Sequence, residues 1–144
     1  MATVELRFSA LPEHVRTARL VAAAVARRAG VDEAVLDEVR LAVGEACSRA
    51  VGLHQSAGIT APVKVSLIEE EKQFSIEVGD EAPHIVPGEG AAGGPGGDEI
   101  DAEEDEMGLA VISGLVDDVE VSAGEHGGLI RMTWPTAPQT VVLP

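Results

Sequence analysis

The chain has 144 residues, a hydrophobic content of 45% and a formal net charge of −15. This length and hydrophobic content fit one folded domain of ordinary size, whereas the strong acidity excludes direct binding to nucleic acid, which requires a basic surface. No charged-then-apolar leader opens the sequence and no apolar run approaches the ~18 residues of a membrane span, so we expect a cytoplasmic protein with no membrane contact.

The first third of the chain predicts one strand and two helices. Residues 3–8 alternate between polar and apolar types in the manner of a half-buried strand. A helix then begins near Pro12 and ends at Gly30. Its apolar stripe has helical spacing and comprises Val15, Ala18, Ala22, Val25 and Ala29. Asp32 is the expected N-cap of a second helix, which runs to about Leu53.

The rest of the chain predicts paired strands interrupted by a long loop. Residues 63–67 and 74–78 alternate as two strands of a hairpin. Residues 81–106 are rich in glycine and acidic side chains and predict a flexible lid. A short helix from Met107, a strand at residues 119–121, a last strand at 129–134 and a loose tail at 136–144 follow. We therefore expect a single α+β domain over residues 1–144, a two-layer α/β sandwich with a mixed, mostly antiparallel sheet covered by helices.

The second helix contains the most informative stretch of the sequence, residues 37–50. Its core side holds small apolar residues at helical spacing, namely Val39, Val43, Ala46 and Ala50. Cys47, the only cysteine, lies among them and is expected to be a buried core residue rather than a reactive thiol. Glu45 and Arg49 lie one turn apart on another face.

This stretch resembles the first nucleotide-binding motif of the anti-sigma-factor serine kinases, a branch of the GHKL ATPases with the histidine-kinase-like (Bergerat) fold. The resemblance is strongest at residues 11–19 and 37–50 and covers nearly the whole chain. It implies the same order of elements as the one predicted above, from the first strand to a glycine motif that opens a helix after the lid.

In this family the position of Glu45 is the general base that accepts the proton of a substrate serine. The alternative is a helix-surface glutamate paired with Arg49. Arg49 itself stands where the family has an asparagine that binds magnesium. A guanidinium group has only hydrogen-bond donors, so we do not expect magnesium in the usual geometry. Arg49 could instead contact a phosphate directly.

Two further motifs of the resemblance are incomplete. Asp80 matches the aspartate that accepts a hydrogen bond from adenine, but Ala82 and His84 replace the glycines that follow it in the family. The alternative is an ordinary turn aspartate at the end of a strand. Because glycine lets the backbone approach a nucleotide closely, these replacements weaken the match.

The glycine motif after the lid is also altered. Gly108 and Leu109 match its second half, while Glu106 occupies its first glycine and competes with any anion at that helix N-terminus. The segment from Asp80 to Glu106 holds ten acidic residues and no Lys or Arg, which disfavours a bound ATP. We therefore expect reduced or lost ATP binding.

The resemblance also implies a protein partner. In the family an arginine early in the first helix contacts both the sigma factor and its competitor, and Arg19 is the best match, with Arg16 second. The helix also carries Arg27 and Arg28. The alternative is an exposed arginine on a solvated helix face. Residues 1–60 hold seven Arg and seven acids, whereas the remainder carries the whole net charge of −15, so the first helix is the most basic surface available.

The sequence thus favours an anti-sigma regulatory factor that binds and inhibits a sigma factor, is countered by an anti-anti-sigma protein of the STAS type, and acts as a homodimer. The alternative is an active ATP-dependent serine-protein kinase that phosphorylates the anti-anti-sigma partner, with Glu45, Arg49 and Asp80 in the roles above. A sensor that binds another ligand in the remodelled pocket is a third hypothesis. Whether the chain is an enzyme stays open at this stage.

Overall fold

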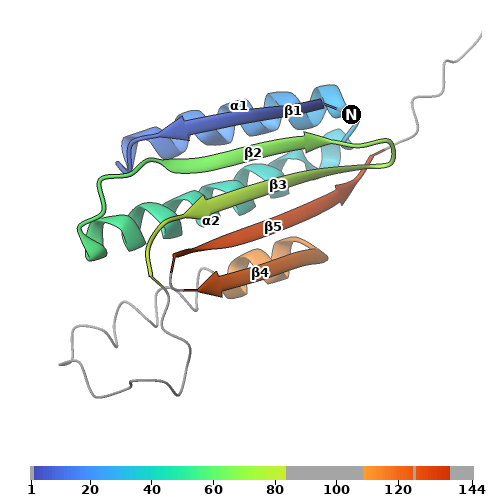
Figure 1. The fold of residues 1–144 in the computed structure, drawn as a ribbon. Coiled ribbons are helices and arrows are strands. Elements are labelled where there is room, and N and C mark those ends of the chain that lie inside the picture. Colours follow the sequence, from blue (N-terminus) through green and yellow to red (C-terminus); the bar gives the residue numbers. More distant parts are fainter. Residues whose placement is uncertain (1, 84–108, 125, 137–144) are drawn as a thin grey trace, which may run out of the picture.

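The computed structural model describes residues 2–83, 109–124 and 126–136. In chain order the elements are β1 (Ala2–Phe8), α1 (Glu13–Ala29), a short 3-10 turn η1 (Glu33–Val35), α2 (Leu36–Ala57), β2 (Val63–Glu69), β3 (Gln73–Asp80), a helix at residues 109–115, β4 (Asp118–Gly124) and β5 (Gly127–Pro135). The strands form one sheet in the order β1-β2-β3-β5-β4, and the helices lie on one face of it (Figure 1).

The predicted two-layer α+β sandwich is confirmed. The sequence predicts a mixed sheet, whereas every strand pair within the described ranges is antiparallel. The predicted lid lies outside the described residues except for its first three positions, 81–83, as does the predicted tail except for Thr136.

Helix α1 forms as its sequence predicts. It ends at Gly30, whose φ of 102° lies in the left-handed region and whose N–H donates to the carbonyl groups of Ala26 and Arg27. Val15, Ala18, Ala22 and Ala29 are buried and Val25 is half-buried. The corresponding apolar positions of α2, residues 39, 43, 46 and 50, are buried as well and belong to the same core cluster.

Helix α2 differs from the prediction at both ends. The carboxylate of Asp32 accepts the N–H of Ala34 at 3.0 Å, so it caps η1, and α2 itself begins at Leu36. The helix extends past Leu53 to Ala57, because Gly58 adopts a φ of 67° and provides the left-handed C-cap there.

The sheet packs its apolar face against the helices. Leu67, Ile76 and Met132 are paired across β2, β3 and β5 and are fully buried; burial of each such side chain stabilises the fold by about 1.5–3 kcal/mol. The opposite face carries polar residues in register, for example Glu77 beside Arg131. Alternation is the pattern that the sequence predicts for the two hairpin strands at residues 63–67 and 74–78.

Cys47 lies in the core with no exposed surface, which confirms its prediction. Burial raises the pKa of its thiol to about 12, so a thiolate does not form near neutral pH. Within residues 2–83 and 109–124, no helix is both long and apolar enough to cross a lipid bilayer.

Candidate functional site

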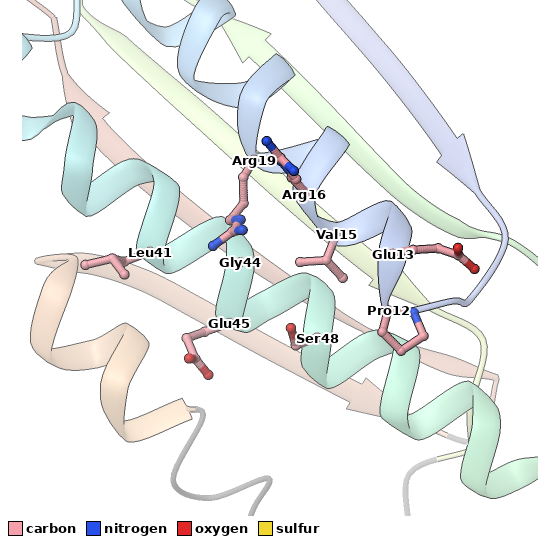
Figure 2. Close-up of a pocket in the computed structure, with 9 residues that line it drawn as sticks. All are labelled: Pro12, Glu13, Val15, Arg16, Arg19, Leu41, Gly44, Glu45 and Ser48. Atoms are coloured by element: carbon pink, nitrogen blue, oxygen red, sulfur yellow. The ribbon is translucent and has the colours of Figure 1, made fainter.

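A surface pocket of about 530 Å³ lies between the first half of α1 and the middle of α2 (Figure 2). Its lining comes from the two helices and the residue before α1: Pro12, Glu13, Val15, Arg16, Arg19, Leu41, Gly44, Glu45 and Ser48. The sequence singles out Arg16 and Arg19 for a partner and Glu45 as a base. The structure brings these three side chains to one pocket.

Gly44 accounts for the path of the Arg19 side chain. It is buried in the middle of α2, and a Cβ atom at this position would lie only 2.7 Å from Cδ of Arg19. Arg19 therefore crosses α2 where α2 has no side chain, with its guanidinium turned toward α2 in Figure 2. The sequence prediction missed this contact, although a glycine within a helical pattern commonly has a packing reason.

The pocket combines charged and apolar groups. Two guanidinium groups, from Arg16 and Arg19, and two carboxylates, from Glu13 and Glu45, surround it, and all four residues are exposed. Leu41 adds an apolar wall and is 54% exposed. A guanidinium group binds a carboxylate through two parallel hydrogen bonds. The pocket can therefore hold an acidic side chain of a protein partner, with an apolar neighbour against Leu41.

A second feature lies at the end of β3, where Asp80 is buried. Its Oδ2 is 3.9 Å from Nη1 of Arg49, and the two side chains are only 2% and 7% exposed. Its Oδ1 accepts the backbone N–H of Ala82 at 3.0 Å. Arg49 is thus a buried side chain in an ion pair with a strand end, and both hypotheses for Glu45, the general base and the helix-surface partner of Arg49, stay predictions. The interaction at 3.9 Å is a charge–charge attraction rather than a hydrogen bond.

His54 joins the end of α2 to the same strand end. Its ring is fully buried. Nδ1 donates to the carbonyl oxygen of Ala61 and Nε2 accepts the backbone N–H of Glu81, each at 2.9 Å. These partners fix the neutral tautomer with the proton on Nδ1. The sequence shows four histidines scattered over different elements, and nothing in that pattern reveals this role.

These residues do not fit the nucleotide and metal of the family motif. Arg49 offers no lone pair to a cation, and its guanidinium lies beside the carboxylate that the resemblance assigns to adenine. Asp80 already accepts the N–H of Ala82. The bond between Asp80 and the N–H of Ala82 is that of an Asx turn, as expected for the alternative of a turn aspartate, and the ion pair with Arg49 is a second contact of the same carboxylate.

The last motif is only partly described. Leu109 is the first described residue of the helix at residues 109–115 and packs, half-buried, against the core. Gly108, Glu106 and His84 lie outside the described residues, so their proposed match to the family motifs stays a prediction.

The protein is an α+β domain with one layer of helices on one antiparallel sheet. Its helices form the surface pocket described above and also contact the buried end of β3. The chain belongs to the histidine kinase-like ATPase domain family, whose model matches residues 8–134. It is 28% identical over 127 residues to the anti-sigma F factor of Clostridium acetobutylicum, and this match covers 87% of each chain.

A solved structure shows the same fold. The crystal structure of the RsbU and RsbW domains of a Mycobacterium tuberculosis protein matches with a TM-score of 0.68 and 16% identity, over 96% of this chain and 33% of that one. The present chain thus spans about a third of that longer protein. The family model confirms the predicted membership of the GHKL ATPases, and the solved structure confirms the fold.

Proposed function

We propose that the protein is an anti-sigma regulatory factor that binds a sigma factor and holds it inactive. The observation that supports this function best is the pairing of Arg16 and Arg19 in one exposed pocket between α1 and α2. The similarity to a protein named anti-sigma F factor supports the class of partner. The guanidinium groups would receive acidic side chains of the sigma factor, and Leu41 would contact an apolar one.

The distribution of charge supports the same surface. Residues 1–60 are neutral, with seven Arg and seven acids, while the rest of the chain carries the net charge of −15. An acidic partner surface is repelled by the second part of the chain and meets least repulsion at the helices. The pocket is therefore the surface best suited to such a partner.

Charge reversal at Arg19 tests this function. We expect Arg19→Glu to weaken binding to the cognate sigma factor about 100-fold, because a carboxylate in the pocket repels an acidic partner group and removes a charge-assisted contact. The measurement is isothermal titration calorimetry against each purified sigma factor from the same genome. Arg19 is exposed, so the substitution is expected to leave the fold intact.

Arg28→Glu is the matched control for this experiment. Arg28 is exposed near the other end of α1 and outside the pocket, and its reversal changes the net charge by the same amount. We expect it to weaken binding less than threefold through long-range repulsion alone. Equal losses for the two variants, or no loss for Arg19→Glu, would refute the pocket as the binding surface.

We further propose that a STAS-type anti-anti-sigma protein competes for this pocket, that the protein acts as a homodimer, and that residues 1–144 form one such domain. Arg16 and Arg19, the proposed contacts for both the sigma factor and the anti-anti-sigma protein, lie in a single pocket. The two proteins would therefore compete for it. A competitor that occupies the pocket excludes the sigma factor directly, without a covalent step.

The proposed function includes reduced or lost ATP binding, with magnesium in the usual geometry least expected. We predict no heat of ATP binding up to 1 mM nucleotide in calorimetry, with or without magnesium, because Arg49 and Ala82 already engage the carboxylate of Asp80. Micromolar binding that Asp80→Ala abolishes would instead support the alternative, a serine-protein kinase with Glu45 as base. Phosphate transfer to the anti-anti-sigma protein would then be the next measurement.

A further inference from the structure

Helix α2 makes two buried contacts with consecutive residues at the end of β3. We propose that Arg49 and His54 form an internal clamp that holds this strand end in the place of a bound nucleotide, so that the pocket between α1 and α2 is presented at all times. This inference rests on the proposed loss of nucleotide binding. It adds that Arg49 and His54 hold the end of β3 without a nucleotide.

The two contacts fix the strand end from one helix. Arg49 places its charge 3.9 Å from the carboxylate of Asp80, and His54 accepts the N–H of Glu81 at 2.9 Å. The side chains of Arg49, His54 and Asp80 are all nearly or fully buried. Because these groups are shielded from water, the charge–charge attraction and the hydrogen bond are each stronger than the same contact would be on the surface.

The clamp also orients the first residues after the strand. The second carboxylate oxygen of Asp80 accepts the N–H of Ala82, so the carboxylate faces Arg49 on one side and its own chain on the other. An adenine amino group that used this carboxylate would compete with the Arg49 charge and the Ala82 N–H for it. Weakening a buried ion pair is unfavourable, and the clamp therefore disfavours a bound nucleotide.

The same helix forms one wall of the partner pocket. Leu41, Gly44 and Glu45 line it, and Arg49 and His54 follow on the next turns of α2. Fixing α2 against the end of β3 therefore fixes the pocket wall. The structure needs no bound ligand to set this position, because the groups that set it belong to the chain.

Thermal unfolding of a double-mutant cycle tests the clamp in the full-length protein. We expect Asp80→Asn to lower Tm by about 10 °C, because it leaves the Arg49 charge buried beside a neutral group. The double variant with Arg49→Met should regain at least half of this loss, since no buried charge then remains. Arg27→Met, which breaks the exposed pair of Arg27 with Glu33, is the control and should change Tm by less than about 2 °C.

Hydrogen exchange and sigma-factor binding provide independent readouts. In Arg49→Met, the amides of Glu81 and Ala82 should exchange at least tenfold faster, and affinity for the sigma factor should fall at least fivefold although residue 49 does not line the pocket. Magnesium-ATP at 1 mM should leave the wild-type Tm unchanged within 1 °C.

The outcomes separate the clamp from the proposed function. Additive effects in the cycle, or unchanged exchange at Glu81 and Ala82 in Arg49→Met, would overturn the clamp even where sigma-factor binding is intact. If Asp80→Asn fails to fold, the exchange in Arg49→Met still decides. A wild-type protein that shows the expected coupling and exchange but binds no sigma factor would keep the clamp and reject the proposed function. Stabilisation of the wild type by ATP would overturn the clamp.

Discussion

Replacing Gly127 with alanine is expected to lower the free energy of unfolding by about 3–5 kcal/mol, a large share of the stability of a small domain. Gly127 has a φ of 138°, and a Cβ atom there would lie 2.1 Å from the carbonyl oxygen of Asp80 and 3.1 Å from Cα of Glu81. These are backbone atoms, which cannot move aside as a flexible side chain can. Urea unfolding followed by circular dichroism measures the loss as a shift of the midpoint.

Gly124→Ala is the matched control, because Gly124 pairs directly with Gly127 in the same hairpin. A Cβ atom at Gly124 meets nothing within 4 Å, so we expect a change within about 0.5 kcal/mol. Similar losses for the two variants would show that the hairpin is merely sensitive to any side chain. A loss confined to Gly127→Ala would identify the positive φ of Gly127 and its close approach to the end of β3 as the causes.

Local periodicity explains why the elements of this fold could be predicted. The stripe from Val15 to Ala29 repeats at helical spacing, and each residue of the strand at 63–67 alternates between core and solvent. Such patterns depend only on neighbours in the chain. The strand order, in which β5 lies between β3 and β4, depends on distant pairings that no local pattern specifies.

The site could be predicted residue by residue but not as an arrangement. The sequence presents Arg49 as a lost magnesium ligand and Asp80 as a weak strand-end match, two separate departures from the family. In the structure they are one buried ion pair. The pairing joins a helix to a strand end far along the chain, and burial of both groups decides its strength. Neither fact can be read from spacing.

The same reason hides the pocket from the sequence. The resemblance singles out Arg16, Arg19 and Glu45 one at a time, and their roles stay predictions. That they share one pocket follows from the path of the Arg19 side chain over Gly44, which depends on how the two helices pack. The glycine at position 44 thus determines where the Arg19 side chain can lie, which the charged residues alone do not reveal.

His54→Leu is expected to reduce the free energy of unfolding by about 2–5 kcal/mol, because it leaves two buried backbone groups without their partners. These are the carbonyl of Ala61 and the N–H of Glu81. Leucine is similar in size, so the loss reflects hydrogen bonding rather than a cavity. His54→Gln retains an acceptor that can reach the N–H of Glu81 and should lose less than His54→Leu.

The control for His54 is His126→Leu, since His126 is exposed in the turn before β5 and its loss should stay within about 0.5 kcal/mol. Hydrogen exchange at the Glu81 amide shows whether His54 stabilises the fold by hydrogen bonding or by packing alone. If His54→Leu loses stability while the Glu81 amide stays as protected as in the wild type, the ring acts as a packing residue only. If that amide becomes the fastest to exchange at the strand end, the histidine is the group that fixes the chain where β3 stops.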